Sequence, residues 1–370
     1  MGDAGHPLLG SLVSLADGGL VASGRLSVRE VEWLADHVVA GSVVVPGTAL
    51  LDLVVFAGDR LGCGGVEELT LQAPLVVAER GEAEIQIVVG SPDEFERRAL
   101  AVYSRVVGLV DESWTQHAEG VLTADVVPAG FDLSQWPPTG GELVDVGSRY
   151  EDLAGAGLVY GPVFQGLRSV WRRGDEVFAE VALPEGADTS GFAVHPALLD
   201  AALHAIGVGE FVADDAGQGR VPFAWGDVVV HASGASTLRV RLAPSASGSG
   251  GVAVEVADGV GRPVASVGSL VLRPVSAGQF TRRLDSLFQL HWTTVPLPDA
   301  PAASPEVYEV PVGGDVHGVV NVVLGRVQEW LAGGGQGPLA VVTRGGVVAR
   351  AGDVVGDLAH AAVWGLVRSA

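Results

Sequence analysis

The chain contains no lysine, so all 22 of its basic residues are arginines, and these stand against 44 acidic residues. The formal net charge of −22 gives a surface that repels nucleic-acid phosphates and anionic lipid headgroups. Cysteine occurs once, at Cys63, which excludes an intramolecular disulfide and a metal site built from several cysteines. These shortages predict a cytoplasmic protein that binds neither nucleic acid nor membranes.

Long apolar runs and several familiar motifs are also missing. Windows such as Leu50–Ala57 are far shorter than the roughly 20 residues that a membrane-spanning helix needs. The first residues carry neither the basic segment nor the long apolar segment of a secretory signal. The chain has no G-x-S-x-G elbow, no Walker or G-x-G-x-x-G loop and no H-E-x-x-H pair. These absences count against serine hydrolysis, nucleotide binding and a bound metal.

The composition that remains is that of a folded protein of two or three domains. Hydrophobic residues make up 48% and charged residues 18% of the 370 positions. In residues 1–126 the pattern predicts one helix, which opens at Pro46 and buries the apolar face of ALLDLVVFAGDRL. Strands are predicted around it at Leu20–Leu26, Val66–Val77, Ala83–Val89 and Ala99–Val110.

The second part, residues 143–276, repeats this plan after a connector at residues 127–142 that contains FDLSQWPPTGG. One apolar helix is predicted at His195–Val208, and Ser245–Gly251 is predicted to be a loop. The strands expected around the helix are Ser169–Trp171, Val177–Leu183, Val228–His231, Thr237–Leu242, Val252–Ala257 and Val264–Arg273. The two parts together indicate two sheets, each wrapped around a central helix.

The third part, residues 277–370, changes to an alternating order. Strands are predicted at Val307–Val312 and Leu339–Arg344, and helices at Val316–Leu331 and Val355–Ser369. This order is typical of an α/β unit with a parallel sheet. Two strands leave sheet faces uncovered, so we expect the rest of the unit to be missing from this chain or supplied elsewhere. The predicted fold class is α+β, with a truncated C-terminal α/β fragment.

The first candidate site is the segment DHVVAGSVVVPGTALLD, in which His37, Gly41 and Pro46 precede the first helix. The amides of Gly47 and Thr48 belong to the first helical turn and lack intrahelical acceptors, so they can stabilise a developing oxyanion. A base beside an oxyanion site is what enolate chemistry requires. The alternative is that His37 is a hydrogen-bonded polar residue at a strand end.

The second candidate site is HPALLDAALHA, in which Asp200 and His204 are four residues apart and share one helix face. Burial in this Ala- and Leu-rich helix would disfavour the charged carboxylate, as a general acid requires. The alternative is that Asp200 is a charged residue near the N-terminal end of the helix dipole and that His204 faces solvent. His195, which precedes Pro196, is predicted to be structural.

Five motifs in order resemble the dehydratase domain of a modular type I polyketide synthase. The start HPLLG at His6–Gly10 matches the first motif of that domain, and His37, Gly41 and Pro46 match H-x-x-x-G-x-x-x-x-P. The pair Asp200 and His204 matches D-x-x-x-Q/H in its histidine form. The other matches are Y-G-P-x-F at Tyr160, Gly161, Pro162, Val163 and Phe164, and L-P-F-x-W, with valine for leucine, at Val221, Pro222, Phe223, Ala224 and Trp225. The segments RRLDSLFQLHW at Arg282–Trp292, LAVVTRGGVV and AVWGLVRSA resemble the opening of the structural subdomain of a ketoreductase.

The resemblance implies a double hotdog fold with a tunnel between its halves, and a reaction. A β-hydroxyacyl thioester on the 4′-phosphopantetheine arm of an acyl carrier protein would lose water to give an enoyl thioester, with no cofactor bound by this chain. His37 would take the α-proton, Asp200 would protonate the leaving hydroxyl, and His204 would hold Asp200. The Gly47 amide would bind the thioester oxygen and Tyr160 would line the tunnel, as would the other motif residues Gly41, Pro46, Gly161, Pro162, Phe164, Pro222, Phe223 and Trp225.

The resemblance also implies partners and leaves two other activities open. The expected partners are the carrier protein, the ketoreductase and other domains of the same synthase, and a second copy of the chain. Nothing in the motifs separates simple dehydration from a double-bond isomerase or a cyclase that forms an oxygen heterocycle, which would use the same two residues. A non-catalytic scaffold is the third alternative, and intact His37 and Asp200 argue against it.

Overall fold

A computed structural model describes residues 4–78, 81–107, 113–125, 127–209, 211, 219–246, 250–275, 305–333, 337–348 and 354–369. The chain divides into two compact units, Met1–Arg283 and Leu284–Ala370, which we describe separately. The predicted boundary at residue 277 and the segment Arg282–Trp292 lie outside the described residues. The predicted divisions near residues 126 and 142 fall within the first unit and stay predictions.

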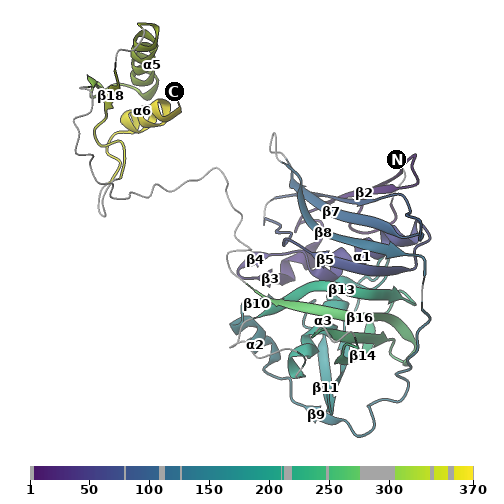
Figure 1. The fold of residues 1–370 in the computed structure, drawn as a ribbon. Coiled ribbons are helices and arrows are strands. Elements are labelled where there is room, and N and C mark those ends of the chain that lie inside the picture. Colours follow the sequence, from purple (N-terminus) through teal and green to yellow (C-terminus); the bar gives the residue numbers. More distant parts are fainter. Residues whose placement is uncertain are drawn as a thin grey trace. The chain divides into compact units, whose positions relative to one another are not determined.

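The first unit is built mainly from strands (Figure 1). Its strands are β1 (Ser11–Ser14), β2 (Leu20–Leu26), β3 (His37–Val39), β4 (Ser42–Val43), β5 (Gly65–Leu71), β6 (Ala83–Val89), β7 (Arg98–Val106), β8 (Thr115–Thr123), β9 (Glu142–Val144), β10 (Leu158–Tyr160), β11 (Leu167–Arg173), β12 (Glu176–Ala182), β13 (Arg220–Val230), β14 (Thr237–Pro244), β15 (Val252–Ala257) and β16 (Pro263–Pro274). Its helices are α1 (Gly47–Asp59), α2 (Arg149–Gly155) and α3 (Pro196–Leu203), with 3₁₀ helices η1 (Glu32–Asp36) and η2 (His204–Val208).

Thirteen of the described strands form one continuous sheet. The N-terminal half contributes the order β1-β2-β6-β7-β8-β5, and the C-terminal half contributes β13-β16-β15-β14-β12-β11-β9. The halves join where β5 pairs antiparallel with β13, with Leu69 opposite Trp225. A second, small sheet of β10, β3 and β4 also crosses between the halves. The two predicted sheets are therefore present, but they are joined edge to edge.

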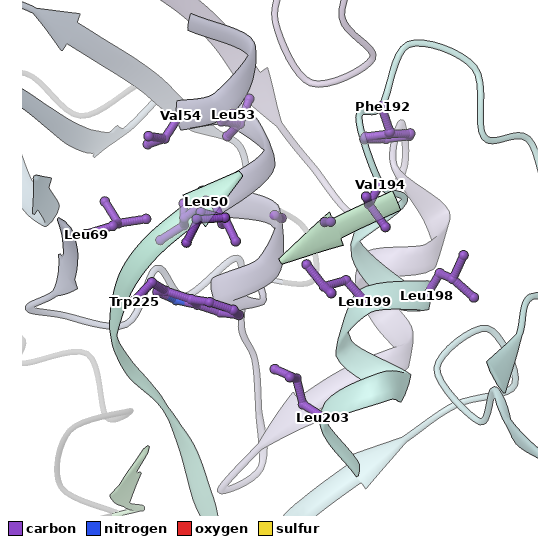
Figure 2. Packing of buried hydrophobic residues seen from close by; sticks show 14 of the residues in the cluster. Leu50, Leu53, Val54, Leu69, Phe192, Val194, Leu198, Leu199, Leu203 and Trp225 are labelled. Atoms are coloured by element: carbon purple, nitrogen blue, oxygen red, sulfur yellow. The ribbon is translucent and has the colours of Figure 1, made fainter. Parts of the chain in front are cut away.

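Each half of the large sheet packs on its own helix. Helix α1 contacts β5 and β6 and also reaches β13, whereas α3 contacts β12 and β14, and the two helices contact each other. Most residues of α1 and all residues of α3 are buried. Figure 2 shows Leu50 and Leu53 of α1 and Leu198 of α3 among the packed side chains. Full burial of such a side chain contributes about 1.5–3 kcal/mol. This is the double hotdog arrangement, and it confirms the predicted fold class of the first unit.

Strand bounds agree with the prediction where side chains alternate between the core and the surface. β2, β6 and β15 begin and end at the predicted residues, because their alternating residues are buried in turn. The last residues of the predicted strand Ala99–Val110, and the middle of the loop Ser245–Gly251, lie outside the described residues.

Other predictions of secondary structure are wrong in part. The strand expected at Val66–Val77 ends at Leu71, and Pro74 beyond it cannot donate a ladder hydrogen bond. The strand expected at Val228–His231 begins at Arg220 as β13, and β8 was not predicted at all. The single helix expected at His195–Val208 is an α-helix only to Leu203 and continues as the 3₁₀ helix η2.

The second unit has the expected alternation. β17 (Glu306–Glu309) pairs parallel with β18 (Leu339–Val342), and these strands alternate with α5 (Val316–Ala332) and α6 (Leu358–Ser369). Its core contains Val310, Val319, Val323, Val327, Ala359 and Val363. In neither unit do the described residues include a helix with the length and apolar character that crossing a membrane requires.

Candidate active site

His37 stands at the start of a tight hairpin formed by β3 and β4. The two loop residues, Ala40 and Gly41, have φ values of 49° and 80°, which is the left-handed pair that a two-residue hairpin turn of this handedness needs. The hairpin brings Val44 back beside His37, and the Val44 amide donates to the His37 carbonyl at 3.1 Å. The spacing from His37 to Gly41 therefore fixes the hairpin turn, and the turn places His37 beside Val44.

The hairpin also selects the protonated nitrogen of His37. Its Nδ1 lies 2.7 Å from the Val44 carbonyl oxygen, which can only accept, so Nδ1 carries the hydrogen and Nε2 keeps its lone pair. Burial lowers the pKa of His37 below its ordinary value of 6.5, although the nearby Asp200 acts in the opposite direction. His37 is therefore a neutral imidazole with a free Nε2, as a general base requires.

Asp200 faces that nitrogen from the other half of the unit. It lies in α3, and its Oδ2 is 4.0 Å from His37 Nε2 and 3.1 Å from His204 Nε2. The side chains of His37 and Asp200 are 7% and 6% exposed. A separation of 4.0 Å is too long for a hydrogen bond, so His37 Nε2 and Asp200 are not tied to each other.

His204 donates to Asp200. His204 Nδ1 is buried and has no hydrogen-bond partner among the described residues. A hydrogen on Nδ1 would be a buried donor without an acceptor, so the favoured tautomer carries its hydrogen on Nε2. The Nε2 hydrogen then points to Asp200 Oδ2. This hydrogen bond engages Oδ2 of Asp200 and not Oδ1.

Aromatic rings close the site around the two histidines. Tyr160 ends β10 and pairs with His37 across the small sheet, with its ring centroid 4.1 Å from that of His204. Burial raises the pKa of Tyr160 well above its ordinary value, with a further contribution from Asp200, so its hydroxyl stays protonated. Phe164 is fully buried, with its ring centroid 5.1 Å from that of His37.

Asp36, which sequence reasoning missed, holds the Tyr160–Phe164 segment in place. Its carbonyl oxygen accepts from the Gly161 amide at 2.8 Å, and its Oδ2 accepts from the Val163 amide at 2.9 Å. A Cβ atom added to Gly161 would overlap the Asp36 carboxylate and would lie 2.8 Å from the Cβ atom of Asp36. Glycine at 161 is therefore required, and the only signal in the sequence is that Asp36 immediately precedes His37.

Gly47 is the first residue of α1, and Pro46 is its N-cap residue. The Gly47 amide has no acceptor within the helix, and it lies at the positive end of the helix dipole. A Cβ atom here would lie 2.8 Å from Leu71 Cδ1 and 3.4 Å from Pro222 Cβ, so a side chain would require the Leu71 side chain to move. Pro222, Pro46 and Gly47 thus meet at the start of α1.

The other predicted motif residues have different local surroundings, and their place along a tunnel stays a prediction. Pro162 is exposed in the turn after Tyr160, and Phe223 packs under the Arg273 guanidinium. Trp225 is 1% exposed and belongs to the core with Leu50 (Figure 2). His195 caps α3, because its Nδ1 accepts from the Ala197 amide. Across the described ranges, no group of three or more His, Cys, Asp and Glu side chains could hold a metal ion.

Family models match most of the chain. Residues 6–105 match a model described as a polyketide synthase dehydratase domain, and residues 128–282 match one described as a polyketide synthase dehydratase N-terminal domain. Residues 244–370 match the Rossmann fold domain of the polyketide synthase extender module SpnB. The matched ranges together include every candidate site residue.

Individual proteins agree with these models. The chain is 46% identical to polyketide synthase GfsA from Streptomyces halstedii, a match that covers 100% of this chain and 6% of that much longer protein. It is 44% identical to the dehydratase domain from the terminal module of the rifamycin polyketide synthase, with a TM-score of 0.68 over 74% of this chain and 98% of that chain. It is 43% identical to the erythromycin dehydratase, with a TM-score of 0.66 over 73% of this chain and 96% of that chain.

Proposed function

The chain belongs to the dehydratase domains of polyketide synthases. From this premise we propose that it catalyses dehydration during polyketide chain extension, and we propose how its residues divide the reaction. The single observation that carries the proposal is the facing pair: a neutral histidine with a free Nε2, 4.0 Å from a buried aspartic acid held by a second histidine. The α-carbon and the β-hydroxyl of a substrate are two covalent bonds apart. A base and an acid this close can therefore act on both.

His37 Nε2 takes the α-proton, and the electron pair of the broken C–H bond forms the new carbon–carbon double bond. The bond from the β-carbon to oxygen breaks, and Asp200 transfers its proton to the departing hydroxyl, which leaves as water. Atoms balance with one enoyl thioester and one water formed. Imidazolium and carboxylate then face each other, and return of the proton from His37 to Asp200 restores the starting state. Each group of this kind contributes about 10²–10⁴-fold in rate.

Three further groups support these transfers. The Gly47 amide stabilises the thioester oxygen as negative charge develops on it. His204 holds Asp200 so that Oδ1 is free to deliver its proton. Tyr160, protonated and beside His204, supplies a hydroxyl that can orient the substrate.

We also propose the form in which the substrate arrives and the partners of the chain. The thioester is carried on the phosphopantetheine arm of an acyl carrier protein, because a buried reacting pair is reached by a thin arm more readily than by a bulky ester.

The second partner that we propose is another copy of the chain. β1 ends the strand order of the large sheet, and Val13 on it is 39% exposed. This edge suits pairing with a second copy of the chain. Light scattering at high concentration should give twice the 37.8 kDa chain mass, and the chain mass itself would contradict the dimer.

We propose that the second unit has a structural role beside a ketoreductase of the same synthase. Its match is to a Rossmann fold domain, but no glycine-rich phosphate loop occurs in residues 277–370. A calorimetric titration of the chain with a nicotinamide dinucleotide should show no saturable binding. Saturable binding would overturn the structural role.

The reaction itself is tested by product analysis. The native chain is incubated with β-hydroxyacyl thioesters of both hydroxyl configurations on a carrier protein, and the acyl group is followed by mass spectrometry. Loss of one water, with an enoyl product, is expected. An unchanged acyl group would contradict dehydration. A product that has lost water but lacks the conjugated double bond would show a second step.

A further inference from the structure

We propose that Asp52 is a positioning residue for the reaction: by holding the segment that enters α3 against α1, it sets where Asp200 stands opposite His37. The inference rests on the proposed roles of these two residues. It concerns a buried carboxylate that has no part in the proton transfers.

Asp52 joins the two halves of the unit through its carboxylate. It lies in α1 and is 4% exposed. Its Oδ1 accepts from the backbone amides of Ala193 at 2.9 Å and Val194 at 3.2 Å, residues more than 140 positions away in the chain. Thr48, one turn earlier on the same helix, donates from its hydroxyl to the Pro196 carbonyl at 3.0 Å. Helix α1 thus holds three residues at the entry to α3, Ala193, Val194 and Pro196, by three hydrogen bonds.

His6 completes the environment of the carboxylate. Its Nδ1 accepts from the Leu8 amide at 3.1 Å, so the ring hydrogen is on Nε2, which donates to Asp52 Oδ2 at 2.8 Å. Both oxygens of Asp52 are therefore satisfied without a cationic partner, which meets the requirement for burying a carboxylate. The His6 ring also packs on Phe56 and Phe192, with centroids 4.8 Å and 5.4 Å away.

The position of these hydrogen bonds connects them to the chemistry. The base and the oxyanion amide belong to the N-terminal half, because His37 is bonded to Val44 and Gly47 follows three residues later. The acid Asp200 belongs to α3, which begins at Pro196, the last of the residues that hydrogen-bond to α1. Asp200 lies one helical turn beyond Pro196, so a shift of the α3 entry moves its carboxylate directly. A displacement of about 1 Å between reacting groups can cost on the order of 10²-fold in rate.

The test compares substitutions of α1 in the full chain. Asp52→Ala removes all three contacts of the carboxylate, and Thr48→Val removes one hydrogen bond while keeping the side-chain shape. Asp59→Asn is the matched control, because Asp59 lies on the same helix but is exposed. kcat and KM are measured with a carrier-bound β-hydroxyacyl thioester at a temperature well below each variant's thermal midpoint, which is determined separately.

We expect Asp52→Ala to lower kcat by about 10–100-fold with KM within about twofold of the native value. Thr48→Val should change kcat in the same direction by a smaller factor, and it carries the test if Asp52→Ala does not fold. Asp59→Asn should match the native chain. A lower thermal midpoint with kcat within twofold of native in the folded variants would overturn the inference and leave Asp52 as a stabilising residue only. A rise in KM alone would also overturn it. A native chain that forms no enoyl product would instead contradict the proposed function.

Discussion

Replacing Gly161 by alanine should damage the site without touching either reacting residue. The added methyl group would lie 2.8 Å from Asp36 Cβ and still closer to the atoms of its carboxylate, so the carboxylate must move. The Val163 amide then loses its 2.9 Å bond to Asp36 Oδ2. A hydrogen bond to a charged group contributes about 1.5–3 kcal/mol, and we expect the free energy of unfolding of the first unit to fall by this amount.

The same substitution should lower kcat by about tenfold or more. The segment around Gly161 carries Tyr160 and Phe164, whose ring centroids lie 5.6 Å and 5.1 Å from that of His37. A shift of this segment therefore displaces the walls of the site, and displacements of about 1 Å have effects of this size.

Urea unfolding and steady-state kinetics measure the two effects, with Gly155→Ala as the control. Gly155 ends α2, and a Cβ atom there would meet nothing within 4 Å. The double variant Asp36→Gly/Gly161→Ala should be no worse than Asp36→Gly alone, because the obstructing carboxylate and Cβ atom are both gone. If Gly161→Ala behaves like Gly155→Ala in both measurements, the contact with Asp36 does not constrain the site and the reasoning is wrong.

Three further outcomes are expected. Because burial lowers the pKa of His37, the acidic limb of kcat/KM against pH should have its midpoint below 6.5, and a midpoint at or above 6.5 would contradict this. The stability gained by burying the neutral ring should be fully present above pH 6.5 and should be lost as pH falls from 6.5 through the lowered pKa of the folded state. Gly41→Ala, at φ 80°, should reduce the free energy of urea unfolding by roughly 1–2 kcal/mol, and an unchanged value would show that the hairpin tolerates a side chain. His204→Gln should keep most of the turnover because its amide can still donate to Asp200, whereas His204→Leu should lose about tenfold or more in kcat, and equal rates for the two variants would exclude the orienting bond.

The periodicity of apolar residues predicted those strands and helices whose pattern of buried residues is visible within the element itself. Alternating burial marks β2 and β6, and the contact between Asp200 of α3 and His204 at the start of η2 follows from their four-residue spacing. Elements without a clear period were missed. β8 buries His117 and Ala118 in succession, and β3 with β4 is too short for a period to appear.

Contacts between distant segments could not be read from the sequence. Asp36 and Asp52 look like ordinary acidic residues there, yet each accepts from backbone amides of the other half, 127 and 141 residues further along the chain. The approach of His37 to Asp200 was expected only through the family resemblance, because no local pattern links a β-hairpin to a helix 163 positions later. The join of β5 to β13 depends on two edges that meet only in the folded unit.

The division of labour between His37 and Asp200 is tested most directly by turnover of three variants: His37→Ala, Asp200→Asn and the double variant. Each is first shown to be folded by its thermal midpoint, and enoyl formation from a carrier-bound β-hydroxyacyl thioester is then timed by mass spectrometry. We predict that each single variant loses at least about 10²-fold in rate and that the double variant is no slower than the slower single one, because the two groups act in one step. Native turnover in either single variant would contradict the account.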